Sequence, residues 1–321
     1  NVTTGTQNTL IGGLAGDALT TGIQNVALGY NALSAEDTGS GNTAVGRYAL
    51  AQLNYAGYSG NTAVGWVSGY QIGTGTGNTL LGSGRNTAVG TSALFTADGS
   101  DRNVAVGYEA LKDEDAHGRN AAIGYQTLRA QDAGADAYNV AVGYKAGLAV
   151  LTGVQNVLAG GLAGDALTTG SYNIAIGTGA LGTEDTGGRT VAIGHNALNI
   201  QDAGSDTYNV AVGYNAGGAV TTGAYNTIIG GLAGDALTDG IENVLIGLAA
   251  GGALTSGGSN VAIGPYALDS EDGHGRNIAI GRAALGVQNA GADAYNVAMG
   301  YHAGTAVTTG IRNTIIGGLA G

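Results

Sequence analysis

The sequence predicts an all-β protein, a β-solenoid of about 19 stacked rungs, each built from a 17-residue repeat or a 19-residue variant of it. Composition is the first indication, because 63 of the 321 residues are Gly while 44% are apolar and only 11% are charged. Such a chain is too apolar to remain disordered. The second is a five-residue block that recurs along the whole chain. A repeat this short buries its apolar side chains only by stacking on copies of itself.

The recurring block has the form Asn-x-x-x-Gly and marks the start of each rung. One variant block begins at Thr190, where Thr replaces Asn. The others begin at Asn8, Asn25, Asn42, Asn61, Asn78, Asn86, Asn103, Asn120, Asn139, Asn156, Asn173, Asn209, Asn226, Asn243, Asn260, Asn277, Asn296 and Asn313. Most steps are 17 residues and four are 19, but the step from Asn78 to Asn86 is only 8. We therefore expect residues 1–321 to form a single continuous solenoid with one irregular, truncated repeat near residues 78–86.

Two types of repeat alternate along the chain. The first type reads NVAVGYEALKDEDAHGR from Asn103, and the second reads NVLAGGLAGDALTTGSY from Asn156. The 19-residue variant always precedes the second type, and a higher-order unit of 70 residues relates Asn139 to Asn209. The segment GGLAGDALTTG, present twice without change, therefore marks one rung type within a larger repeat.

Each block predicts a short strand, because Val or Ile at its second and fourth places share one face and Ala takes the other. We expect Val, Ile and Leu to fill the interior. The outward Ala stripe would either pack against another chain or only suit a tight coil. That stripe comprises Ala44, Ala63, Ala88, Ala105, Ala141, Ala192 and Ala211.

The Gly that ends each block permits a turn, and an Ala three residues later suggests a second short strand. Asp, Asn or Thr then closes a further turn.

The recurring Asn predicts a side-chain ladder along one turn, each amide bonding to the next rung, although a simple local turn is the alternative. The ladder residues are Asn8, Asn25, Asn42, Asn103, Asn120, Asn139, Asn156, Asn173, Asn209, Asn226, Asn243, Asn260, Asn277, Asn296 and Asn313. Rungs spaced by about 4.8 Å would give a rod on the order of 90 Å long.

Charge and composition exclude several classes of function. The net charge is −12, and Lys112 and Lys145 are the only lysines, so the chain lacks the basic surface that nucleic acids or anionic membranes require. The absence of Cys removes disulfides and Cys-rich metal sites. The sequence contains no run of 18 apolar residues, so it predicts no membrane-spanning helix. It also shows no signal-peptide pattern at its start.

The segments NTAVGRYAL, NVAVGYEAL, NIAIGTGAL and NVAIGPYAL resemble the head repeats of trimeric autotransporter adhesins, and similar repeats occur in bacteriophage tail fibres. The resemblance covers essentially the whole chain, although the repeat is longer here than in the usual adhesin head. It implies a left-handed parallel β-roll and a homotrimer of chains side by side.

The acidic pairs suggest calcium binding or acid–base chemistry. Asp115 and Asp132 should lie on adjacent rungs, as should Asp185 and Asp202, and a bridging Ca²⁺ would relieve the repulsion within each pair. Thr takes the same place in the second repeat type, which favours a role in turns, so we expect no cofactor. The acids recur at every equivalent turn, so none is singled out as a catalytic residue, and we expect no enzymatic activity.

Tyrosines are the strongest indication of a ligand-binding or interface surface. Aromatic rings on a sheet stack on sugars or pack at interfaces, and here they could also fill the gaps between rungs. The candidates are Tyr138, Tyr144, Tyr208, Tyr214, Tyr295 and Tyr301. Trp66 and the truncated repeat at Asn78 mark the irregular region, a kink or attachment point.

These observations predict a non-enzymatic structural protein, extracellular, on a cell surface or on a virion. We expect the shaft of a bacteriophage tail fibre or bacterial adhesin, a stiff rod with a multivalent surface. Its partners would be its own copies and a cell-surface glycan or protein. The alternative is a subunit of an extracellular head-to-tail filament, because Gly321 falls halfway through a repeat without a polar cap. A calcium-binding or glycan-degrading module is a third hypothesis.

Overall fold

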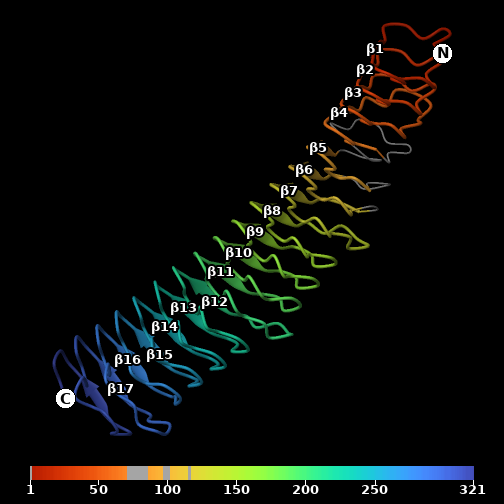
Figure 1. The fold of residues 1–321 in the computed structure, drawn as a ribbon. Coiled ribbons are helices and arrows are strands. Elements are labelled where there is room, and N and C mark those ends of the chain that lie inside the picture. The colour runs from red at the N-terminus through yellow and green to blue at the C-terminus, as the bar shows by residue number, and fades with distance from the viewer. Residues whose placement is uncertain (1, 71–85, 97–101, 115–116) are drawn as a thin grey trace. The chain divides into compact units, whose positions relative to one another are not determined.

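The computed structural model of the chain describes residues 2–70, 86–96, 102–114 and 117–321. These residues form a parallel β-solenoid with 18 three-residue strands and no helix (Figure 1). The predicted fold class is confirmed, and so is the repeat length, because Ala27 of one strand pairs with Ala44 of the next. The block at Asn78 lies outside the described residues.

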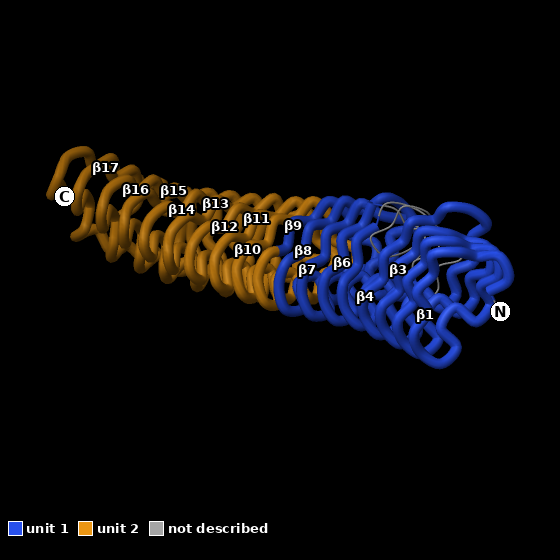
Figure 2. Tube along the Cα trace, turned by 90° about the horizontal axis from the view of Figure 1, so that it is seen from above, with its two compact units in different colours: residues 1–158 blue, residues 159–321 orange. Residues whose placement is uncertain are grey.

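The chain divides into two compact units, residues 1–158 and 159–321, coloured blue and orange in Figure 2. In the first unit, two sets of neighbouring strands pair in parallel. One set is β1 (Thr9–Ile11), β2 (Val26–Leu28), β3 (Thr43–Val45) and β4 (Thr62–Val64). The other is β5 (Thr87–Val89), β6 (Val104–Val106), β7 (Ala121–Ile123) and β8 (Val140–Val142). Strand β9 (Val157–Ala159) spans the boundary between the units.

The second unit continues the same pattern, and its strands pair in parallel in chain order. They are β10 (Ile174–Ile176), β11 (Val191–Ile193), β12 (Val210–Val212), β13 (Thr227–Ile229), β14 (Val244–Ile246), β15 (Val261–Ile263), β16 (Ile278–Ile280), β17 (Val297–Met299) and β18 (Thr314–Ile316).

The middle residue of each strand from β2 to β17 points into the solenoid and is fully buried. The expectation that Val and Ile fill the interior while Ala faces outward is therefore wrong. The expected outward stripe, Ala44, Ala63, Ala88, Ala105, Ala141, Ala192 and Ala211, is inside. The interior of each rung also receives side chains such as Ala197 and Leu198 from its opposite wall. Opposite such a Leu, the middle strand residue is Ala, as in Ala192, whereas rungs with Gly on that wall can hold a larger one, as in Leu158 and Leu245.

The expected second strand is also wrong for the described residues, which form turns after each Gly. The backbone there alternates between ordinary and left-handed conformations, with φ of 54° at Asn196 and 47° at Leu198. Left-handed backbone is unfavourable for a bulky residue, but Leu198 is buried and its N–H donates to the Ala216 carbonyl at 3.1 Å. Packing and rung-to-rung hydrogen bonds thus hold a conformation that local preference would not select.

Glycine closes each block because no other residue fits there. Gly213 has φ of 142°, and a Cβ added to it would lie 2.5 Å from the carbonyl oxygen of Gly230 in the next rung. The turn after each strand therefore stacks backbone directly on backbone. This close approach explains why the Gly is present in every block.

The two repeat types fill the interior in complementary ways. In the first type a Leu such as Leu198 occupies the eighth place after the Asn, and in the second type that place is Gly. At Gly147, a Cβ would lie 2.7 Å from Leu158 and 2.8 Å from Leu128. A Gly on one rung thus makes room for larger side chains on its neighbours, so the alternation of types is a packing pattern.

Candidate functional site

The most extensive candidate site is the outer face of the strands, formed by the first and third residue of each. These residues are mostly Val, Ile and Thr, and many are well exposed, among them Val140 at 43% and Ile176 at 38%. No strand in the described part of the chain contains a charged residue. Each unit therefore presents two rows of apolar or β-branched side chains to solvent. The sequence pattern did not predict this face, because the alternation was interpreted with these residues in the interior.

The recurring Asn side chains form a column whose described members from Asn25 to Asn296 are buried, and they bond from rung to rung. The N–H of Asn42 donates to Oδ1 of Asn25 at 2.9 Å, and the N–H of Asn260 donates to Oδ1 of Asn243 at 3.0 Å. At the one substitution, the Thr190 N–H still donates to Oδ1 of Asn173 at 3.0 Å, and its Oγ1 lies 2.8 Å from Oγ1 of Thr207. The column holds the rungs in register, which is a structural role rather than a binding role.

A buried carboxylate joins this column beside the lengthened rungs. Oε1 of Glu184 accepts a hydrogen bond from the Gly187 N–H at 2.7 Å, and its Oε2 accepts one from Nε2 of Gln201 at 3.0 Å. Oε1 of Gln201 in turn accepts Nδ2 of Asn209 at 2.8 Å. Burial raises the pKa of Glu184 above its usual value, although these hydrogen bonds partly offset the effect.

The same arrangement recurs at the next lengthened rung. Nε2 of Gln288 donates to Oε2 of Glu271 at 3.0 Å, and Oε1 of Gln288 accepts Nδ2 of Asn296 at 2.8 Å. The Glu of each acidic pair is thus part of the internal network. This use of Glu could not be read from the sequence, which suggested solvated turns or metal ligands.

The predicted metal-ligand candidates occupy turn positions. Asp185 and Asp202 come together with Glu184, and one carboxylate oxygen of each lies within 4.8 Å of the others. The Asp185 carbonyl also accepts the Thr168 N–H at 2.7 Å, so Asp and Thr stack at equivalent turns. Asp132 lies at the corresponding turn, where its N–H donates to the Leu151 carbonyl at 2.8 Å. Asp115 lies outside the described residues.

Three of the predicted tyrosines lie beside an arginine and an aspartate that sequence analysis did not single out. The Arg119 guanidinium lies 5.2 Å from the Tyr138 ring centroid and pairs with Asp136. The equivalent groups elsewhere are Arg189 with Tyr208 and Asp206, and Arg276 with Tyr295 and Asp293. These contacts link adjacent rungs at three of the four lengthened repeats, so these tyrosines contribute to packing within the chain.

The other three tyrosines are exposed, and each contacts another aromatic ring. Tyr144 stacks on Tyr125 with 5.4 Å between ring centroids, and Tyr214 stacks on His195 at 5.5 Å. Tyr301 lies against His302 at 4.3 Å. These three residues are at least 53% exposed, so they are available to a partner while still contacting the neighbouring rung or residue.

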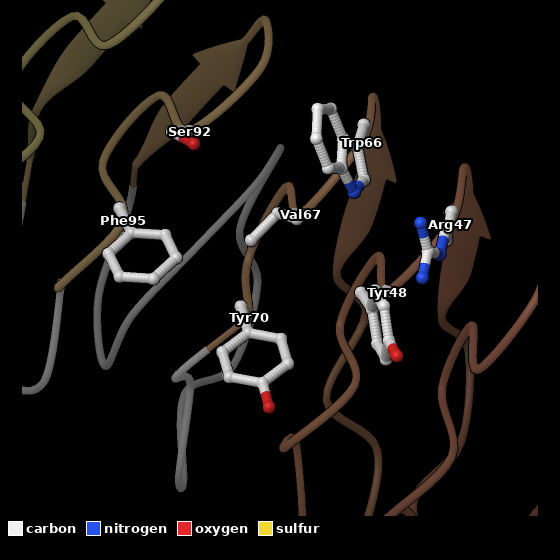
Figure 3. Close-up of a pocket in the computed structure, with 7 residues that line it drawn as sticks. All are labelled: Arg47, Tyr48, Trp66, Val67, Tyr70, Ser92 and Phe95. Atoms are coloured by element: carbon white, nitrogen blue, oxygen red, sulfur yellow. The ribbon is translucent and has the colours of Figure 1, made fainter.

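One cavity breaks the regularity of the first unit. It measures about 380 Å³ and is lined by Arg47, Tyr48, Trp66, Val67, Tyr70, Ser92 and Phe95, which come from the turns after β3, β4 and β5 (Figure 3). Trp66 marks an irregular region in the sequence pattern, but that pattern does not place it beside Tyr70 or Phe95. The chain contains one Trp and one Phe. The occurrence of both in the same irregular part of the sequence is the signal that could have indicated the cavity.

Among the residues that the structure describes, no helix has the length and apolar character needed to cross a membrane. Comparison of the chain with protein-family models, curated proteins and solved structures found no match. The architecture alone therefore classifies the chain, as a parallel β-solenoid repeat protein.

Proposed function

We propose that the chain is a non-enzymatic segment of an extracellular fibre in which copies lie side by side with their outer faces in contact. The observation that carries this proposal is the exposed apolar outer face of β1–β18. Soluble proteins rarely expose large contiguous apolar patches except where they bind a partner. The regular repetition of Val and Ile along this face supports an extended interface rather than a small ligand site.

A further copy of the chain is the partner that the geometry favours. The rows on the outer face repeat once per rung, about 4.8 Å apart, and a second copy offers rows of the same spacing. Charge supports this pairing, because the net charge of −12 lies outside the strands. Copies can therefore meet at the outer face without bringing like charges directly opposite one another.

The resemblance of the blocks to adhesin heads and tail fibres supports a homotrimer and a place on a cell surface or virion. A non-enzymatic role is supported by the way the acids are used. Glu184 and Glu271 hold side chains and backbone within the solenoid rather than lining a cleft as a catalytic pair. The fibre's mechanism is then mechanical, since repetition supplies length and multiple weak contacts add by avidity.

Disulfide trapping tests the proposed contact, since the chain has no Cys of its own. Ile229 on the outer face and Ile200 in a turn are similarly exposed, at 37% and 42%. We expect Ile229→Cys to form disulfide-linked pairs of chains under mild oxidation and Ile200→Cys to remain largely unlinked. Equal linking of both variants, or none with Ile229→Cys in a folded sample, would contradict the proposed contact.

A further inference from the structure

The cavity of Figure 3 lies at a break in the stack of the first unit. Strands β4 and β5 belong to different sheets. A Cβ placed on Gly65 would lie 3.3 Å from the Gly90 carbonyl oxygen, against 2.5 Å for the regular step from Gly213 to Gly230. The rungs are therefore farther apart at this step, and the side chains beside it are released from the regular spacing.

The residues at the break depart from the repeat pattern. The ninth residue after the block Asn is Tyr70 in one of these rungs and Phe95 in the next, and it is aromatic in no other regular repeat. Trp66, the chain's only Trp, stands on the first of these rungs and is 53% exposed. Large aromatic side chains are thus concentrated where the stack opens, and a merely structural repeat does not require them there.

The rings are arranged at different angles around the cavity. Tyr70 and Phe95 are nearly parallel, at 2°, with centroids 6.1 Å apart, while Tyr48 meets Tyr70 edge-on at 5.9 Å. Aromatic walls with a few polar groups are typical of small-ligand pockets of about 300–1,000 Å³. The cavity is near the lower end of this range, which suits one or two sugar rings packed by their apolar faces.

Arg47 supplies the charged group of the cavity. Its guanidinium lies 4.9 Å from the Tyr48 ring centroid and 5.7 Å from that of Tyr30. In the part of the chain that the structure describes, Arg47 forms no ion pair with a carboxylate, whereas Arg119, Arg189 and Arg276 each pair with an Asp. A guanidinium held by rings but lacking an anion is prepared for a carboxylate, which it binds with two parallel hydrogen bonds.

We propose that this cavity binds a carboxylated sugar, a uronic or sialic acid residue of a glycan. The sugar ring packs against Trp66 and Tyr70, and its carboxylate pairs with Arg47. This inference deepens the proposed function by giving the fibre a ligand class, and it rests on that proposal only for its biological setting. The cavity itself is formed by a single chain.

Trp66 provides the measurement, because it is the only tryptophan and its fluorescence reports on the cavity alone. The probes are tetragalacturonate for uronic acids, 3′-sialyllactose for sialic acids, and α-1,4-linked galactotetraose and lactose as their respective neutral counterparts. We expect a saturable change in Trp66 fluorescence with at least one acidic probe and weaker binding of its neutral counterpart. Which acidic probe binds decides between the two sources of the carboxylate.

Arg47→Gln should weaken binding of the acidic probe by about tenfold or more, the loss expected for a hydrogen-bonded charge pair. The matched control is Arg282→Gln, because Arg282 occupies the same place in its repeat but lies outside the cavity. Arg282→Gln should bind the acidic probe with the same affinity as the unaltered chain. Phe95→Leu should weaken acidic and neutral probes alike, and thermal unfolding should show that each variant is folded.

The proposal is overturned if neither acidic probe gives a saturable change at concentrations on the order of 10 mM. It is also overturned if the neutral probes bind as tightly, or if Arg47→Gln binds like the unaltered chain. The native mass of the same samples separates this result from the fibre proposal. Multiple copies without sugar binding would reject the cavity proposal alone, and a sugar-binding monomer would reject the self-associating fibre alone.

Discussion

Oδ1 of Asn226 accepts two hydrogen bonds from Asn243 on the next rung, one from its backbone N–H at 3.0 Å and one from its side chain at 3.1 Å. Both side chains are buried. Each Asn thus satisfies its neighbour's polar groups and depends on the other neighbour to satisfy its own. A buried amide column of this kind rewards in-register stacking and penalises a slipped rung, because a slip would leave several polar groups unpaired.

Loss of one amide from this column should be strongly destabilising. In Asn243→Ala, the Asn260 N–H and the Gly257 carbonyl lose the partner that now lies 3.0 and 2.9 Å away. We expect a loss of about 2–4 kcal/mol, since each buried unpaired group costs about 1–3 kcal/mol. Thermal unfolding followed by circular dichroism checks this against Ser259→Ala, which removes an exposed hydrogen bond to Glu242. Equal midpoints for the two variants would contradict the role of the column.

The backbone contact between rungs predicts a clear contrast between two glycines. Gly213→Ala would force a Cβ against the Gly230 carbonyl at an unfavourable φ of 142°, whereas a Cβ at Gly161 meets nothing within 4 Å. We expect Gly213→Ala to lose at least about 2 kcal/mol and Gly161→Ala to change stability by less than about 0.5 kcal/mol. Unfolding midpoints of the two variants measure the contrast, and a tolerated Gly213→Ala would argue against direct backbone stacking.

The direction of the strand residues can be tested at two adjacent positions. Ala192 is fully buried while Val191 is only half-buried on the outer face. Ala192→Leu should overpack the interior and lose about 1–3 kcal/mol, whereas Val191→Ala should lose less than about 1 kcal/mol. Urea unfolding of both variants under conditions where the chain is dispersed gives the comparison. The opposite ranking would place Val inside and Ala outside.

The buried carboxylate of Glu184 predicts a pH dependence of stability. Because burial raises its pKa above the ordinary 4.5, the folded chain favours the protonated acid. Its contribution to stability is therefore fully present below pH 4.5 and is lost as the pH rises through the raised pKa. We expect the unfolding midpoint of the unaltered chain, relative to that of Glu184→Gln, to fall as the pH rises above 4.5 and through the raised pKa. A difference independent of pH would exclude this effect.

A second carboxylate should act in the opposite direction. Glu109 is partly buried, which disfavours its charge, but hydrogen bonds from Gln126, Lys112 and Arg129 outweigh this and lower its pKa to about 2. Its contribution to stability is present above pH 4.5 and is lost as the pH falls towards about 2. The unaltered chain should therefore lose stability relative to Glu109→Gln in strong acid, measured by thermal unfolding. An advantage that persists there would contradict this.

The sequence predicted the fold because Asn and Gly serve the backbone at the same place in every rung. Asn226 satisfies hydrogen bonds of the main chain, and Gly213 permits close contact between main chains. Because these requirements recur in every rung, they produce a period in the sequence that can be recognised without knowing how the side chains pack. The inside and outside of the strand could not be predicted in the same way. Alternation of Val191 and Ala192 separates two faces, but only the narrow interior decides that Ala is the one that fits.

Contacts that depend on which rungs lie side by side were also beyond the sequence. The pairing of Arg189 with Asp206 joins two rungs through a lengthened loop. The extra residues of this loop change which side chains lie beside each other on the two rungs, and the local pattern does not specify that change. The cavity required three rungs to be placed together around Trp66. Its residues were individually unusual, but only their convergence in space suggests a ligand.

The central claim is that the outer face joins copies of this chain, and the native mass in solution tests it most directly. Light scattering on a size-exclusion column should give a multiple of the 31.2 kDa chain mass, with three copies for the proposed homotrimer. A particle of 31.2 kDa at every concentration examined would contradict self-association and leave the apolar outer face to a different partner.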